Sequence, residues 1–67
     1  IGIVRGAGYL QVDGAGVESV SLYGASGALV ANAKGNRIDI AGVASGVHVL
    51  QVRTAEGVVS RKITIEK

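Results

Sequence analysis

His48 is the residue best suited to acid–base chemistry in this chain of 67 residues, and it is the only histidine. Five serines and the carboxylates of Asp13 and Asp39 could in principle complete a nucleophile, base and acid set with it. Such a set needs a rigid cleft that holds the three groups within hydrogen-bond reach, and so small a domain has little interior from which to build one. By strand parity His48 shares a face with Leu50 and Val52. We therefore expect a partly buried histidine that packs and hydrogen-bonds locally, no catalytic residue, and no enzyme.

Cofactor and metal sites are also disfavoured. Gly14-Ala15-Gly16 resembles the opening of a dinucleotide-binding fingerprint, but the third glycine would fall at Ser19. The residues that follow alternate, and they lack the pattern of a helix whose N-terminus could bind a pyrophosphate. One histidine, no cysteine and no carboxylates two residues apart provide no ligand set for zinc or calcium. We predict a plain turn here, and neither a cofactor nor a metal.

Composition bounds the class of protein and its partners. The apolar residues are mostly Val, Ile and Ala, with no Phe, Trp or Met, which favours strands and a thin core. The formal charge is +2 and the seven basic residues are scattered, so nucleic acid is not an expected partner. No apolar stretch approaches the ~20 residues that span a bilayer. We expect residues 1–67 to form one domain and, since the chain starts without Met, to be a fragment of a longer protein.

Turn residues recur roughly every 8–12 positions between short alternating segments, which is typical of an all-β sandwich or barrel. We expect six to seven antiparallel strands, and the strand order that residues 1–5 add is left open. Helix competes only over residues 24–34, where Gly27 argues against it. The segments predicted as strands are residues 8–12, 17–23, 28–33, 37–40, 46–54 and 58–66, with Val20, Leu22, Ile38 and Ile40 pointing inward.

The last two segments carry the strongest strand pattern. Residues 46–54 have apolar side chains at positions of both parities, which predicts a central strand covered on both faces. Residues 58–66 place Val59, Ile63 and Ile65 on one face. Chain ends normally fray because they make few contacts, so apolar alternation this close to the end predicts a paired terminal strand.

Four segments together carry a family resemblance. They are residues 19–30, the segment Asn36-Arg-Ile-Asp-Ile40, the segment Ser45-Gly-Val-His-Val-Leu-Gln-Val52, and the Glu56-Gly57 turn followed by residues 62–67. In order and spacing they resemble the carboxy-terminal domains of proteins exported by the type IX secretion system of Bacteroidota. The match runs from about residue 8 to residue 67. His48 stands where this family usually has Tyr, and the Pro-Asn-Pro opening of many members is absent.

The resemblance implies an immunoglobulin-like β-sandwich that serves as a secretion signal. The implied partners are the outer-membrane translocon, a shuttle protein and a sortase-like surface peptidase that commonly removes the domain. The protein would cross the periplasm and reach the outer-membrane surface or the medium. The resemblance implies that the signal has its structural core at Gly46, Val47 and His48 and its exposed or fold-completing end at Lys62, Ile63, Ile65 and Lys67, with turn glycines at Gly27 and Gly57. The alternative is that all of these residues simply stabilise the sandwich.

Other interpretations stay open. The chain could be a non-catalytic binding or adhesion module, for which Tyr9 and Tyr23 are the available sugar-stacking rings. Edge strands could also pair two copies into a homodimer. Arg61, Lys62 and Lys67 could form a basic group beside the terminus, or they could be solvated charges that keep an edge strand from aggregating.

Overall fold

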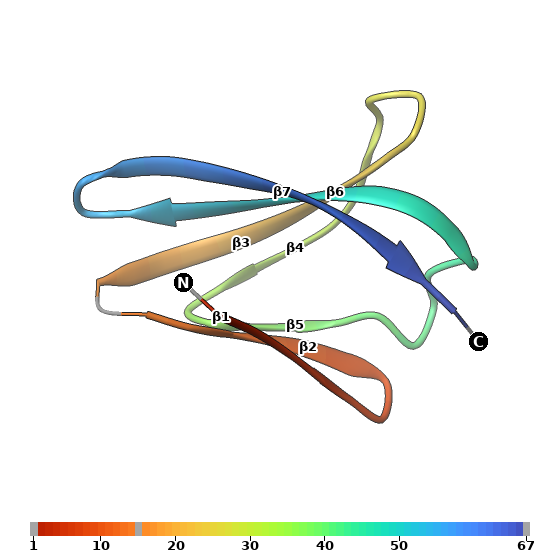
Figure 1. Cartoon of the computed structure of the whole chain (residues 1–67), viewed down its shortest axis with the longest axis horizontal. Coiled ribbons are helices and arrows are strands. Elements are labelled where there is room, and N and C mark those ends of the chain that lie inside the picture. The colour runs from red at the N-terminus through yellow and green to blue at the C-terminus, as the bar shows by residue number, and fades with distance from the viewer. Residues whose placement is uncertain (1, 15, 67) are drawn as a thin grey trace.

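The chain folds into two antiparallel sheets that lie one above the other (Figure 1). The computed structural model describes residues 2–14 and 16–66. This part of the chain contains no helix, and its strands are β1 (Gly2–Gly6), β2 (Tyr9–Asp13), β3 (Val17–Gly24), β4 (Leu29–Lys34), β5 (Arg37–Asp39), β6 (Gly46–Thr54) and β7 (Gly57–Ile65). One sheet has the order β1-β2-β5 and the other has the order β4-β3-β6-β7. The predicted all-β sandwich of six to seven strands is confirmed.

The strand order is immunoglobulin-like. In a constant-type immunoglobulin domain the first, second, fifth and fourth strands form one sheet, and the third, sixth and seventh form the other. Here the fourth strand, β4, pairs with β3 and does not pair with β5. It therefore belongs to the other sheet. The hairpins β1–β2, β3–β4 and β6–β7 each stay within one sheet, while the other connections cross between sheets.

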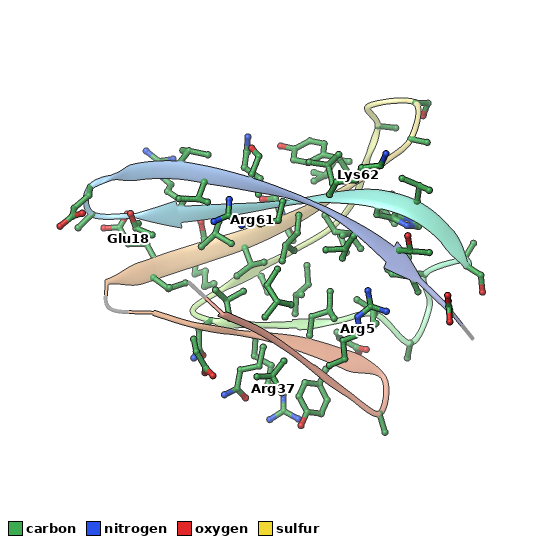
Figure 2. The ribbon with its side chains drawn as sticks, viewed as in Figure 1. Arg5, Glu18, Arg37, Arg61 and Lys62 are labelled. Carbon is green, nitrogen blue, oxygen red and sulfur yellow. The ribbon has the colours of Figure 1, made fainter. Side chains whose placement is uncertain are left out.

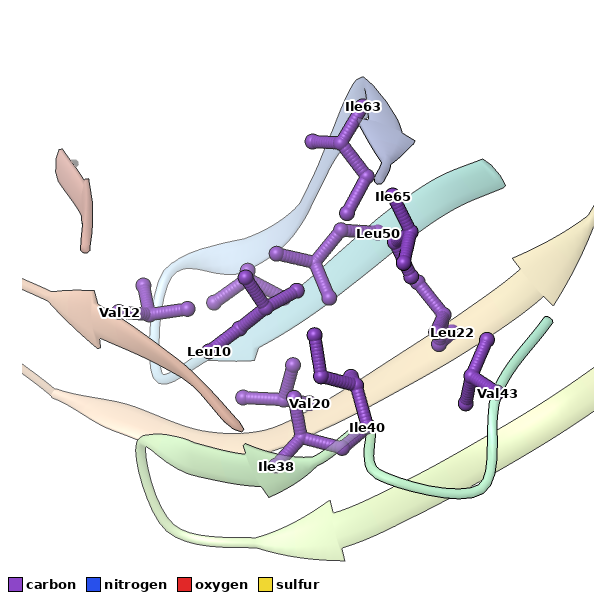
Figure 3. Packing of buried hydrophobic residues seen from close by; sticks show 11 residues of the cluster. Leu10, Val12, Val20, Leu22, Ile38, Ile40, Val43, Leu50, Ile63 and Ile65 are labelled. Carbon is purple, nitrogen blue, oxygen red and sulfur yellow. The ribbon is translucent and has the colours of Figure 1, made fainter. Parts of the chain in front are cut away.

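Alternation along the strands builds the core between the two sheets (Figure 3). Successive side chains of a strand point to opposite faces, so every second residue turns inward. The buried apolar residues come from both sheets and from the β5–β6 connection: Leu10, Val12, Val20, Leu22, Ile38, Ile40, Val43, Leu50, Val52, Ile63 and Ile65. The inward orientation predicted for residues in segments 17–23 and 37–40 is confirmed.

The central strand β6 differs from its prediction. It is a central strand, as expected, and lies between β3 and β7, but only one of its faces is covered. Leu50 and Val52 are fully buried, whereas Val47 is 43% exposed and Val49 is 37% exposed. The prediction that both faces would be covered is therefore wrong. The sheet β1-β2-β5 covers only the inner face of β6, so Val47 and Val49, which point the other way, remain on the outer surface.

Both ends of the described chain belong to sheets. β1 pairs with β2 in a hairpin, from Gly2 opposite Asp13 to Gly6 opposite Tyr9, which resolves the strand order that the sequence left open. β7 pairs with β6 along its whole length, so the predicted paired terminal strand is confirmed. No helix in the described residues is both long and apolar enough to cross a bilayer.

Candidate functional site

The predicted signal residues gather in the hairpin formed by β6 and β7, hereafter the terminal hairpin. Its register places Gly46 opposite Ile65, His48 opposite Ile63 and Val49 opposite Lys62. The two segments that carry the family resemblance at this end of the chain are thus direct neighbours. Lys67 lies outside the described residues.

The inward side of the terminal hairpin is structural. His48 is only 6% exposed, and its Nδ1 donates a hydrogen bond to the Gly46 carbonyl oxygen at 2.9 Å. Ile63 and Ile65 are buried in the core on the neighbouring strand. These three side chains therefore hold the end of β7 onto the sandwich, and they are not available to a partner.

Two glycines give the terminal hairpin its backbone path. Gly46 has φ of 139° and Gly57 has φ of 138°, a region that residues with a Cβ rarely adopt. Gly57 follows the Ala55-Glu56 turn, where Thr54 Oγ1 donates to the Gly57 carbonyl and accepts from the Glu56 amide. Gly27 lies in the β3–β4 turn, and its amide donates to the carbonyl of Gly24 at 2.9 Å.

The outward side of the terminal hairpin is apolar and basic. Tyr23 lies opposite both Leu29 and Val49, and Val49 lies opposite Lys62. These four residues form a row across the outer face of the four-stranded sheet, hereafter the outer row. Val47 lies beside it on β6 and is also exposed. The sequence analysis missed Leu29, because only the register between β3 and β4 shows that it continues the row.

The open edge of the terminal hairpin carries two of the predicted basic residues. Arg61 and Lys62 are both exposed and adjacent on β7 (Figure 2). Arg61 Nη1 donates to the neighbouring Ser60 carbonyl oxygen at 3.2 Å. Within the described residues no carboxylate pairs with either cation. Of the predicted signal residues, Val47 and Lys62 are therefore exposed, while His48, Ile63 and Ile65 are buried.

A second aromatic site lies on the three-stranded sheet. The guanidinium carbon of Arg37 stands 3.8 Å from the centroid of the Tyr9 ring, a cation–π distance. The same ring covers Gly6, where an added Cβ would overlap the aromatic atoms. The sequence analysis missed this cluster; the Gly6-Ala7-Gly8-Tyr9 run, as a tight hairpin, would have placed glycine opposite tyrosine. Tyr9 and Tyr23 lie on different sheets, so they do not form one sugar-stacking platform.

The groups considered for catalysis or metal binding have separate local partners. Asp39 Oδ1 accepts a hydrogen bond from the amide of Ala41 at 2.9 Å, and Asp13 accepts from Gln11 Nε2 at 3.5 Å. Neither carboxylate bonds to His48, whose Nδ1 is held by Gly46. In the part of the chain that the structure describes, no three His, Asp or Glu side chains are grouped so as to hold a metal ion. Among the described residues, these groups are therefore not assembled into one site.

Comparison with protein-family models, curated proteins and solved structures finds no match to this chain.

Proposed function

We propose that this domain is a carboxy-terminal secretion signal that directs a cargo protein through the type IX secretion system, across the outer membrane to the cell surface. The observation that carries the proposal is the register of the terminal hairpin. The Gly46–His48 segment and the Ile63–Ile65 segment both carry the family resemblance, and they pair residue by residue. A receptor could therefore contact the exposed residues of both segments, Val47 and Thr64, side by side.

In this proposal the buried and exposed signal residues have different tasks. His48, Ile63 and Ile65 keep β7 docked on the core. Val47 and Lys62 present an apolar group and a cation to the receptor. β7 also offers a strand edge, and adding a strand to such an edge is a common way to recognise a folded domain.

The proposed partners are the outer-membrane translocon, a shuttle protein and a sortase-like peptidase that removes the domain at or before its amino-terminal end. The domain is a substrate of this machinery and performs no chemistry itself. It would pass through the periplasm and finish at the outer-membrane surface or in the medium.

The decisive experiment fuses residues 1–67 behind a periplasmic reporter in a host that has the type IX machinery. We expect the reporter at the cell surface or in the medium. We also expect that deleting residues 64–67 abolishes export more severely than deleting residues 1–5. A folded fusion that stays in the periplasm, or equal tolerance of both deletions, would contradict the proposal.

A matched pair of variants separates recognition from folding. Val47 and Val58 are both exposed valines of the terminal hairpin, 43% and 56% exposed. Val47→Asp should reduce export because it changes the signal surface, while Val58→Asp at the far end of the hairpin should not. Surface substitutions of this kind change stability little, and circular dichroism of the purified variants verifies that both fold. Equal export of the two variants would remove Val47 from the signal.

The second candidate function is a non-catalytic binding or adhesion module. The outer row favours it, because half-buried Tyr23 and its exposed apolar neighbours Leu29 and Val49 lie on the outer face of the sheet. A glycan-binding screen with Tyr23→Ala as the control distinguishes the two candidates. Binding that depends on Tyr23, in a domain that fails to export its reporter, would support the adhesion module.

A further inference from the structure

β7 is the longest edge strand of the sandwich. It ends the four-stranded sheet, and all nine of its residues pair with β6 without a register shift. The opposite edge strand, β4, has six residues, and its pairing with β3 shifts register between Leu22 and Tyr23. The edges of the other sheet, β1 and β5, have five and three residues. A long regular edge presents a row of unpaired backbone groups that can recruit another strand.

Two adjacent cations are the feature that distinguishes this edge. Proteins usually protect such an edge with proline, a bulge, a covering segment or charge. The chain has no proline, β7 has no bulge, and residues 60–62 and 64 of β7 are exposed and so not under a covering segment; charge is the protection that remains. Arg61 is the central residue of β7 and Lys62 follows it. Because side chains alternate along a strand, one cation lies on each face of the sheet.

This charge pattern opposes a second copy of the chain as the occupant. Two β7 strands that paired antiparallel about their centres would place Arg61 opposite Arg61, or Arg61 opposite Lys62. Like charges directly opposite each other on paired strands are destabilising, whereas opposite charges attract. An added strand with two consecutive carboxylates would instead place one beside each cation, on the two faces of the sheet.

We propose that the β7 edge binds an extended acidic segment of a partner protein by strand addition, with two consecutive Asp or Glu residues beside Arg61 and Lys62. Neither cation has a carboxylate partner among the described residues, so both are available to such a segment. Ser60 and Thr64, which flank Lys62 on the outer face, leave room for ordinary strand-forming residues on either side of the acidic pair. This proposal rests on the proposed sorting function, under which the partner is the receptor of the signal. It adds that the receptor segment is acidic.

The test uses the isotopically labelled 67-residue chain and synthetic peptides of nine residues, matched to the length of β7. The first peptide alternates Val and Thr around two central glutamates, and the control carries two lysines in their place. We expect the diglutamate peptide to change the NMR chemical shifts of every second amide of β7, the amides that point away from β6. The amide shifts of β4 should stay unchanged. Added salt should weaken this binding. Equal binding of the two peptides, or perturbation centred on β4, would overturn the proposal.

A charge-reversal pair sharpens the test. Lys62→Glu should weaken diglutamate binding about tenfold, because an attractive cross-strand pair becomes a repulsive one. Lys34→Glu makes the same charge change on the other edge strand of the same sheet and should leave binding unaltered. The double variant Arg61→Glu, Lys62→Glu should bind the dilysine peptide more tightly than the diglutamate peptide. Unchanged chemical shifts of its β6 amides would verify that it folds. Equal losses in the Lys62 and Lys34 variants would contradict the assigned site.

The oligomeric state tests the alternative occupant. If the unmodified chain sediments as a dimer whose interface protects the outward β7 amides, a second copy occupies the edge and the proposal fails. A monomer that binds the acidic peptide supports it. Since no secretion machinery is present, failure here leaves the export experiment unaffected, and failure of export leaves the peptide result unaffected.

Discussion

The ring of His48 lies among the core residues of β6, and its Nδ1 is 2.9 Å from the carbonyl oxygen of Gly46. Strand parity alone predicted this local, packed role, because Leu50 and Val52 share its face and are fully buried. The hydrogen bond also explains how a polar ring is tolerated there, since a buried polar group without a partner is costly. His48 therefore helps to maintain the shape of the terminal hairpin.

Two substitutions separate the ring of His48 from its hydrogen bond. His48→Phe keeps an aromatic ring and loses the bond to Gly46, so we expect a cost of about 1 kcal/mol in the free energy of unfolding. His48→Ala removes the ring as well and should cost about 3 kcal/mol. Urea denaturation followed by circular dichroism measures both. If the Phe variant were as unstable as the Ala variant, the hydrogen bond and not the packing would be the main contribution.

Gly46 and Gly42 provide a matched test of backbone conformation. Neither has atoms within 4 Å of an added Cβ, but only Gly46 has a positive φ, 139°. Gly46→Ala should therefore destabilise the fold by about 1–3 kcal/mol through strain. Gly42→Ala should be neutral or stabilise it by up to about 1 kcal/mol, since it restricts the unfolded chain. Equal effects in thermal unfolding would show that the positive φ is not what requires glycine at position 46.

The strand β7 combines a buried face and an open edge in one element. Its inward residues Ile63 and Ile65 complete the core, and its outward residues Lys62 and Thr64 remain in solvent. Truncating the chain at this end therefore removes a core residue together with any receptor contact. Point substitutions on each face are needed to distinguish the two roles.

Ile65 and Thr64 are adjacent residues with opposite roles in β7. Ile65 is 2% exposed, so Ile65→Ala should lower the free energy of unfolding by about 2–5 kcal/mol. Thr64 is exposed, and Thr64→Ala should change the free energy of unfolding by less than about 0.5 kcal/mol. Hydrogen exchange of the β7 amides should accelerate in the Ile65 variant alone. Rapid exchange of these amides in the unmodified chain would mean that β7 is not held on the sandwich in solution.

The sequence predicted the strands well and the surfaces less well, for a physical reason. Period-two alternation encodes which residues of 17–23 and 37–40 turn inward, and the structure confirms them. Apolar residues on both faces of 46–54 predict burial on both sides, yet Val47 and Val49 are exposed. A covered face and a surface suited to a partner have the same composition. Only the placement of the second sheet distinguishes them.

The site could be predicted only in part, because register is a long-range property. The resemblance selected Gly46–His48 and residues 62–65 as two segments, and the pairing of β6 with β7 joins them. Leu29 enters the outer row through the irregular β3–β4 register, and Gly6 meets Tyr9 through the β1–β2 hairpin. Alternation within a single segment carries no information about these cross-strand neighbours.

The whole domain depends on one thin core that both sheets share. Its extents are 30 × 25 × 17 Å, and the buried cluster draws residues from each sheet and from the β5–β6 connection. Neither sheet can keep its inner face away from water without the other. Folding should therefore be a single cooperative transition, as is usual for small domains.

Two equivalent core substitutions, one in each sheet, test this cooperativity. Ile38 in β5 is 1% exposed and Ile65 in β7 is 2% exposed. Ile38→Val and Ile65→Val should each cost about 0.5–1.5 kcal/mol, and each should lower the unfolding midpoint of both sheets together. Residue-resolved NMR along a urea titration measures the two sheets separately. A shift confined to the sheet that carries the substitution would show that the sheets unfold independently.

The distribution of tyrosines makes such a measurement simple. The chain has no Phe or Trp and two tyrosines, Tyr9 in one sheet with Arg37 against its ring and Tyr23 in the other beside Val49. Biosynthetic incorporation of fluorotyrosine would thus place one magnetic reporter in each layer. A two-line fluorine spectrum would then follow unfolding, and Tyr23 alone would respond to a ligand that settles on the face bearing the outer row.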